Sequence, residues 1–123
     1  MELKDKIIVV TGAASGIGRA MCLRYAEEGA KAIACVDLNL EGAQETAAQM
    51  GGTAYGVNVG KADEIAKLIA DVERDLGPID LFCSNAGISI AGGVEVPDDE
   101  WQRIWDINVM SHVWAARALV PLM

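Results

Sequence analysis

The chain has 123 residues, 10 of them basic and 18 acidic, which gives a formal net charge of −8. This length allows one domain at most, and the acidic balance argues against a nucleic-acid partner. No apolar run reaches the roughly 18 residues that would predict a membrane span, and no basic segment precedes an apolar one as in a secretory signal. We therefore expect a cytoplasmic protein without a membrane partner.

The three cysteines, Cys22, Cys35 and Cys83, are an odd number without the spacing of metal ligands. Two of them lie in strand-like runs and one lies in a helix-like segment. This placement is typical of buried thiols in a reducing compartment. We expect neither a disulfide framework nor a metal site.

The first expected strand, Lys6–Val10, runs directly into a glycine-rich loop. Four consecutive apolar residues in this strand indicate burial on both faces. The loop, Thr11–Gly18, then opens a helix-like stretch, Arg19–Glu28. Glycines let a ligand approach the main chain, and a helix start offers unpaired N–H groups to an anion. Strand, glycine loop and helix in this order therefore predict a phosphate-binding loop.

An acidic residue, Asp37, closes the second expected strand, Ala32–Asp37. It lies about 20 residues beyond the last glycine, which is the offset of the dinucleotide-binding fingerprint. A carboxylate at this place can accept hydrogen bonds from both ribose hydroxyls of an adenosine and would repel a 2′-phosphate. The combination predicts NAD rather than NADP. The alternative is that Asp37 only ends a strand and starts a turn, but loop and acid occur together in the expected order.

Three helices are expected between the strands, each with one apolar face towards the sheet. The residues of these faces are Ile17, Met21 and Tyr25 in the first helix, Leu40, Ala43, Ala47 and Met50 in the second, and Ile65, Leu68, Ile69, Val72 and Leu76 in the third. Glycines follow each helix and are expected to end it.

Two further strands are expected at Thr53–Val57 and Ile79–Cys83. We expect all strands to be parallel, an arrangement that right-handed crossovers strongly favour, and Ser84–Gly87 would then lie at the same end of the sheet as the glycine loop. We therefore expect an α/β fold with a Rossmann-type, doubly wound parallel sheet, of which the chain holds the first four strands in the order 3-2-1-4. Residues 1–123 form a dinucleotide-binding domain that is incomplete at the C-terminus.

A last helix is predicted over 98–122, because Pro97 and three acidic residues favour a helix start there. Its many apolar residues, including three tryptophans, exceed what a surface helix carries. We expect it to be buried on more than one side, by the sheet and by a partner subunit. His112, the only histidine, lies within it and is expected to be a packing or surface residue rather than a catalytic base.

Five ordered motifs make the chain resemble the N-terminal half of a short-chain dehydrogenase/reductase of the smaller, single-domain subgroup. They are Thr11-Gly12-x3-Gly16-Ile17-Gly18, Asp37, Asn58-Val59, Ser84-Asn85-Ala86-Gly87 and Asp106-Ile107-Asn108-Val109. The resemblance implies an NAD(H)-dependent oxidoreductase that transfers a hydride between the nicotinamide and a small-molecule alcohol or ketone. It also implies a homodimer or homotetramer that assembles through helix 98–122.

The resemblance further implies roles for individual residues. The residues implied to surround the adenosine ribose and the pyrophosphate are Gly12, Ser15, Gly16, Ile17 and Gly18. Asp37 would hold the adenine ribose, and Asn58 and Val59 would flank the adenine ring. Asn85, Ala86 and Gly87 would support the central strand and line the nicotinamide ribose. Asn108 corresponds to the family's active-site asparagine, whose main-chain carbonyl lies in a helix kink and holds a water of the proton relay.

The chain departs from the family pattern at Asn58, where the family most often has Asp, and at Ser84, where it usually has Asn. The family's catalytic serine and its Tyr-x3-Lys motif do not occur, since glycine and valine stand four residues after Tyr25 and Tyr55. An apolar fourth strand at an open sheet edge would also favour aggregation. We therefore expect the 123 residues to be part of a longer protein and to be inactive in hydride transfer alone. The alternative is a non-catalytic NAD-binding or structural module.

Overall fold

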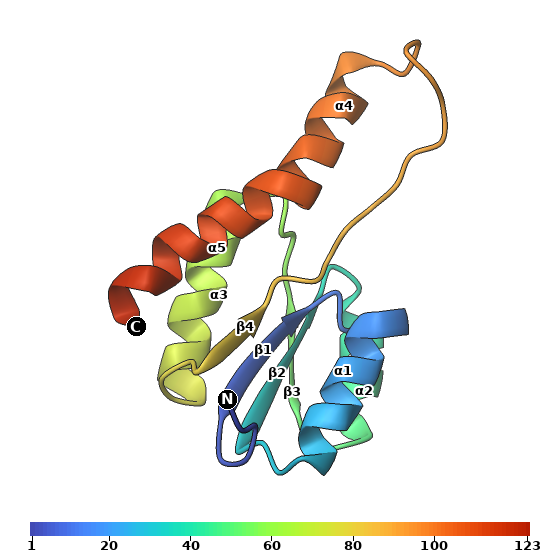
Figure 1. Cartoon of the computed structure of the whole chain (residues 1–123). Helices are drawn as coiled ribbons and strands as arrows, with labels where there is room; N and C mark the ends of the chain where they lie inside the picture. The colour runs from blue at the N-terminus through green and yellow to red at the C-terminus, as the bar shows by residue number, and fades with distance from the viewer.

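The computed structural model describes all residues, 1–123, and shows one parallel sheet with helices on both faces (Figure 1). The strands are β1 (Ile7–Thr11), β2 (Ala32–Asp37), β3 (Thr53–Gly56) and β4 (Leu81–Cys83). They lie in the order β3-β2-β1-β4, and all three pairings are parallel. The Rossmann-type sheet and its predicted strand order 3-2-1-4 are confirmed.

Two helices cover each face of the sheet, and a further helix lies beyond it. The helices are α1 (Gly16–Glu27), α2 (Leu40–Ala48), α3 (Ala62–Asp75), α4 (Asp98–Trp105) and α5 (Ser111–Leu119). A π-helical segment, Asp106–Met110, joins α4 to α5, and a short 3-10 helix, Val120–Leu122, follows. In Figure 1, α1 and α2 lie on one face of the sheet and α3 and α5 on the other. None of the helices is both long and apolar enough to cross a bilayer.

The central strand β1 is buried along its whole length and supplies both halves of the core. Its side chains alternate between the two faces, as in any strand. Val9 packs with α3 and α5 in one cluster, whereas Ile8 and Val10 pack with α1 and α2 in the other. Because β1 is held on both faces and on both edges, the loop that leaves its carboxyl end starts from a fixed position.

The apolar faces predicted for the helices are confirmed for α3 and need correction for the first residues of α1 and α2. Ile65, Leu68 and Val72 of α3 are buried as expected. Ile17 is 73% exposed and lines the cleft, whereas Leu40 is 42% exposed and lies beside Gly56 of the edge strand β3 without joining the core. The physical reason for Ile17 is that α1 begins at Gly16, before the expected Arg19, so that its first turn borders the cleft at the carboxyl end of the sheet.

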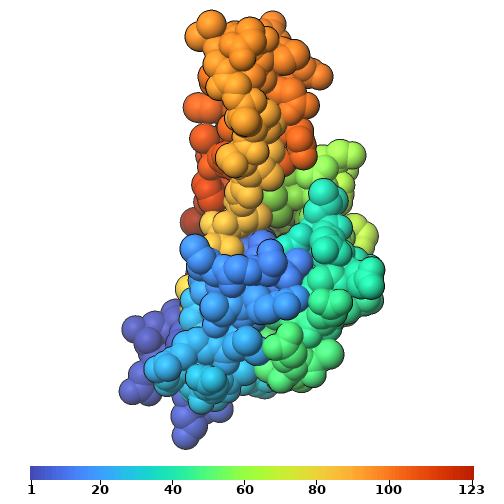
Figure 2. Space-filling view, turned by 90° about the vertical axis from the view of Figure 1, so that its right-hand side faces the viewer, coloured from blue at the N-terminus to red at the C-terminus, as the bar shows by residue number.

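The prediction that the whole segment 98–122 is buried by the sheet is wrong for α4. No residue of α4 is buried, and Trp101 and Trp105 are 53% and 55% exposed. The body of the protein is contacted by α5, whose Ala115 and Leu119 join the α3 side of the core, and by Ile107 of the π-helical segment, which packs against the same cluster. Helix α4 continues in nearly the same direction past the end of the sheet and projects from it (Figures 1 and 2). Its apolar side chains therefore have no sheet beneath them.

Candidate functional site

A cleft of about 480 Å³ lies at the carboxyl end of the sheet. It is lined by all eleven residues that the sequence assigns to a cofactor: Gly12, Ser15, Gly16, Ile17, Gly18, Asp37, Asn58, Val59, Asn85, Ala86 and Gly87. It is also lined by residues that were not predicted: Leu38, Val57, Ile88, Arg103 and Ile107. The residues that follow the strands come together because the carboxyl ends of parallel strands share one edge, where ligands of open α/β sheets bind, whereas Arg103 and Ile107 reach the cleft from α4 and the π-helical segment.

The glycine loop between β1 and α1 uses its glycines for different reasons. Gly12 and Gly16 have φ angles of 74° and 55°, in the left-handed region where other side chains are strained. Around Gly16 the space is open, so only its backbone conformation requires glycine. At Gly18 the space is closed, because a Cβ there would overlap the carbonyl oxygen of Gly12. The loop therefore turns sharply and still lies directly against the first turn of α1.

The first turn of α1 is open to an anion. Its N-cap residue, Ser15, makes no capping hydrogen bond with its side chain, and the turn contains no acidic residue. The first N–H groups of a helix have no acceptor within the helix, and the helix dipole favours negative charge at this end. Since this turn borders the cleft, the loop and helix start together fit a phosphate or diphosphate group.

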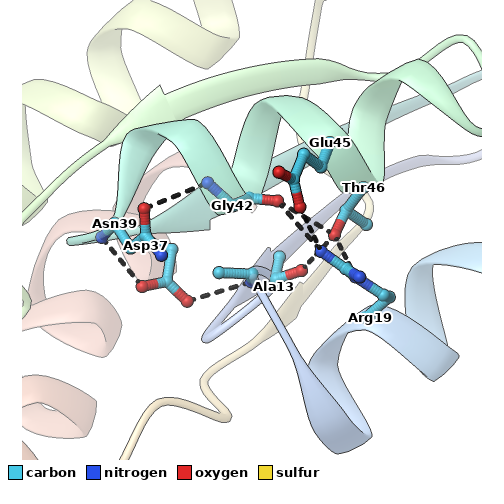
Figure 3. A network of polar contacts seen from close by, with 8 residues as sticks. Ala13, Arg19, Asp37, Asn39, Gly42, Glu45 and Thr46 are labelled. Carbon is cyan, nitrogen blue, oxygen red and sulfur yellow. Dashed lines mark hydrogen bonds and ion pairs between the residues drawn. The ribbon is translucent and has the colours of Figure 1, made fainter.

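The carboxylate of Asp37 lies at the rim of the cleft and is held by two main-chain groups. One oxygen accepts a hydrogen bond from the N–H of Ala14 at 3.0 Å, and the other accepts one from the N–H of Asn39 at 3.0 Å (Figure 3). Each carboxylate oxygen can accept more than one hydrogen bond. Asp37 is thus oriented by the protein and retains acceptor capacity for hydroxyl groups of a ligand.

Asn58 and Val59 follow β3 and form another part of the cleft wall. The Asn58 side-chain oxygen accepts from the N–H of Gly60 at 2.9 Å, a short-range turn contact typical of Asn and Asp. The main-chain N–H of Asn58 donates to Glu64 at 3.0 Å. Asn58 therefore makes with its oxygen the contact that an Asp would make, and its amide remains as a donor. Val59 is buried and provides an apolar surface beside it.

Thr11 is part of the glycine motif in the sequence, but its structural role was not predicted. Its buried hydroxyl accepts hydrogen bonds from the N–H groups of Asn85 and Ala86, at 2.9 and 3.1 Å. The amide of Asn85 donates in return to the Thr11 carbonyl at 3.1 Å. These bonds fasten the chain leaving β4 to the end of β1. The available signal was a hydroxyl residue placed between an entirely apolar strand and the first glycine.

Asn108 lies in the π-helical segment, a type of local widening that is frequent at functional sites. Its side-chain oxygen accepts from the N–H of Ile88 at 2.9 Å, and its amide donates to the Ile88 carbonyl at 2.8 Å. Asn108 does not line the cleft itself. It lines an adjoining open hollow that shares Asn85–Ile88 with the cleft. The side chain therefore holds the strip of chain that separates the two.

Three further titratable side chains near the cleft and the sheet are His112, Tyr25 and Tyr55. Nδ1 of His112 lies 2.6 Å from the Ser84 hydroxyl in the same open hollow. A contact with the Cys83 thiol, together with burial, raises the pKa of Tyr25 to about 12. Burial and the neighbouring Asp75 carboxylate raise the pKa of Tyr55 to about 12. A tyrosine that transfers protons near neutral pH needs a lowered pKa, so neither phenol fits that role.

Comparison with known proteins gives concordant results. The sequence profile of the family described as short chain dehydrogenase matches residues 6–123. Meso-2,3-butanediol dehydrogenase of Serratia marcescens is 33% identical over 98% of this chain and 49% of its own length. Sorbitol dehydrogenase of Cereibacter sphaeroides is 34% identical over 100% of this chain and 49% of its own length.

A solved structure has the same fold. It is described as a short-chain dehydrogenase from Novosphingobium aromaticivorans and aligns with a TM-score of 0.90 at 21% identity, over 98% of this chain and 46% of that one. The chain spans about half the length of the curated relatives that it matches. Because the family profile covers nearly all of its residues, the chain belongs to the short-chain dehydrogenase family.

Proposed function

We propose that the chain is the cofactor-binding part of an NAD(H)-dependent oxidoreductase, which transfers a hydride between the nicotinamide and an alcohol or ketone. The observation that carries this proposal is that the eleven residues assigned from the sequence line a single cleft of about 480 Å³. The nicotinamide supplies the hydride chemistry, and the protein supplies binding and orientation.

Each part of the cleft suits one part of the dinucleotide. The N–H groups at Ser15–Gly18 face the diphosphate, and Gly12 leaves room for its approach. Asp37 accepts hydrogen bonds from the adenine ribose, and its charge disfavours the 2′-phosphate of NADP. The Asn58 amide and the Val59 side chain contact the adenine ring. Main-chain groups of Asn85–Gly87 border the nicotinamide ribose.

Asn108 is the residue of this chain that we assign to the reaction itself. The main chain of Ile88 occupies both ends of its side-chain amide, so we assign the role in the reaction to its main-chain carbonyl. In the wider π-helical turn, that carbonyl is the group proposed to hold a water of the proton relay. Neither tyrosine of the chain fits the role of proton donor to the substrate, because both have raised pKa values, so the chain alone is expected to bind NAD without turnover. The alternative, a non-catalytic NAD-binding or structural module, predicts binding without turnover in the whole protein as well.

The cofactor assignment is tested by titrating the chain with NAD+ and NADP+ in a calorimeter. NAD+ is expected to bind at least tenfold more tightly, because Asp37 is charged and already oriented. The Asp37→Ser variant removes the charge and is expected to weaken NAD+ binding about tenfold, which corresponds to about 1.4 kcal/mol. Asp37→Ser should also reduce the difference between the affinities for NAD+ and NADP+.

The matched control is Asp98→Ser, which removes an exposed carboxylate of α4 that does not line the cleft. It changes the net charge by the same amount and should leave both affinities unaltered. Equal affinities for NAD+ and NADP+ in the unmodified chain would contradict the assignment of Asp37. Turnover is tested in the same preparation: reduction of NAD+ by any simple secondary alcohol would contradict the expectation that the chain alone is inactive.

A further inference from the structure

The middle of α2 is connected to the glycine loop by a buried hydroxyl. The hydroxyl of Thr46 donates a hydrogen bond to the carbonyl of Ala13 at 2.7 Å, across 33 residues of sequence. The same oxygen accepts a hydrogen bond from Nε of Arg19 in α1 at 2.8 Å (Figure 3). Thr46 and Ala13 are both fully buried, and neither lines the cleft. One hydroxyl thus joins the loop, α1 and α2.

The direction of this hydroxyl is unusual for a threonine inside a helix. Such residues ordinarily bond back to the carbonyl four residues earlier. That carbonyl belongs to Gly42 and lies at 3.2 Å, farther than the 2.7 Å to Ala13. The shorter bond therefore goes to the loop. It satisfies a buried main-chain carbonyl that water cannot reach, a group that is costly to leave unpaired.

The neighbouring contacts hold α2 close to the same loop. A Cβ at Gly42 would lie 2.7 Å from the Cβ of Ala14, so the helix approaches the loop more closely than a side chain would permit. The guanidinium of Arg19 also reaches the Gly42 carbonyl at 3.4 Å. The Ala14 N–H is held by Asp37 at 3.0 Å. Ala13 is therefore fixed from outside the cleft by Thr46, whereas Ala14 is fixed by the carboxylate of Asp37 at the rim of the cleft.

We propose that Thr46 is a positioning residue for the diphosphate-binding loop, an inference that rests on the proposed function. By holding the Ala13 carbonyl, its hydroxyl fixes the orientation of the peptide groups that lead to Ser15–Gly18. Without it, the loop samples conformations in which these N–H groups no longer converge on one anion. The apparent dissociation constant then rises in inverse proportion to the fraction of molecules that remain competent to bind.

The test compares ligands that contain or lack a diphosphate. NAD+, ADP and adenosine are titrated into the chain and into Thr46→Val, which keeps the branched shape but lacks the hydroxyl. NAD+ and ADP are expected to bind about tenfold more weakly to this variant, while adenosine binding changes less than twofold. Thr46→Ser retains the hydroxyl and should restore ADP affinity to within about threefold of the unmodified chain.

The matched control is Glu45→Gln. Glu45 is the preceding residue of α2, contacts the same Arg19 at 3.5 Å and is largely exposed, but it does not touch the loop. The Glu45→Gln variant should bind NAD+, ADP and adenosine with the same affinities as the unmodified chain. Where Thr46→Val does not fold, Arg19→Gln serves instead, because it removes the donor to the Thr46 hydroxyl and is expected to weaken ADP binding about threefold.

A purely structural role for Thr46 gives different results. A lowered melting temperature with unchanged ADP affinity of the folded fraction would overturn the inference and leave the proposed function intact. Equal losses for adenosine and ADP would also overturn it, because the effect would then not be specific to the diphosphate. If the unmodified chain binds no NAD+, the proposed function fails, and the inference fails with it.

Discussion

Helices α1 and α2 both begin at the carboxyl end of the sheet, but their first turns are completed in different ways. In α2, the side chain of the N-cap residue Asn39 accepts from the Gly42 N–H at 3.0 Å, and Glu41 places negative charge in the first turn. In α1, the N-cap residue Ser15 makes no such bond, and the first turn has no acidic residue. Of the two helices, only α1 has first-turn residues that line the cleft, namely Gly16, Ile17 and Gly18.

This difference separates a helix start that is capped within the protein from one that is left uncapped and that we propose binds the ligand. Asn39 satisfies an N–H group within the protein and so contributes to folding at all times. The N–H groups at Ser15–Gly18 are left to solvent or to an anion, which costs some stability in the absence of ligand. Substitutions at the start of α2 should therefore change mainly the stability of the fold, whereas substitutions at the start of α1 should change mainly the affinity for the ligand.

The largest effect is expected where the loop and the first turn of α1 touch. Gly18→Ala places a Cβ on the Gly12 carbonyl, so the loop must move away from the helix. We expect NAD+ affinity to fall at least a hundredfold, or about 2.7 kcal/mol, together with a loss of stability. Calorimetry with NAD+ and urea denaturation measure the two quantities.

Gly16→Ala is the matched comparison, because the space around Gly16 is open and only its φ of 55° opposes a side chain. A left-handed conformation costs a non-glycine residue about 1–2 kcal/mol. The loss of NAD+ affinity in Gly16→Ala should be at least several-fold smaller than the loss in Gly18→Ala. Similar losses in both variants would show that backbone strain, rather than contact between loop and helix, limits binding.

A sharper distinction comes from Ser15→Asp, which gives α1 the kind of start that α2 has. An aspartate at the N-cap is expected to stabilise the helix by about 0.5–1 kcal/mol through capping and its interaction with the dipole. The same charge would repel a diphosphate, so NAD+ binding should weaken about tenfold. The free energy of unfolding measured in urea should therefore rise, while the affinity measured by NAD+ titration falls.

Ser15→Asn caps without charge and serves as the control for Ser15→Asp. It should stabilise the chain by a similar amount with a smaller loss of affinity. If Ser15→Asp raised both the stability and the affinity for NAD+, the N–H groups of α1 would not be facing an anion, and the proposed binding mode would be wrong.

Much of this site could be predicted from the sequence because its elements are local. The apolar run of β1, the glycines and Asp37 follow one another along the chain, and parallel pairing then brings the strand ends together. Arg103 was missed because it enters the cleft from α4, about 65 residues after Asp37. No pattern in the neighbouring sequence indicates that its side chain lies at the cleft. The contact of Thr46 with Ala13 was missed for the same reason, since a threonine inside a helix carries no signal for a distant loop.

Hydrophobic periodicity also misassigned residues whose apolar side chains do not face the core. Ile17 recurs one turn before Met21 and so fits the inner face of α1, yet it lines the cleft. Trp101 and Trp105 are apolar without being covered by the sheet, because α4 passes its edge. Periodicity identifies a face of a helix, but it does not distinguish a face that packs on the protein from one that is available to a ligand or another surface.

The smallest effect is expected at the start of α2. Asn39→Ala removes the acceptor of the Gly42 N–H and is expected to destabilise the chain by about 1 kcal/mol in urea denaturation. Because the N–H of Asn39 that holds Asp37 belongs to the main chain, NAD+ affinity should change less than twofold. Asn39→Asp restores a capping oxygen and should recover most of the stability. A loss of NAD+ affinity in Asn39→Ala as large as that in Ser15→Asp would mean that the two helix starts do not act independently, and that α2 contributes to the ligand site through its cap as well as through Thr46.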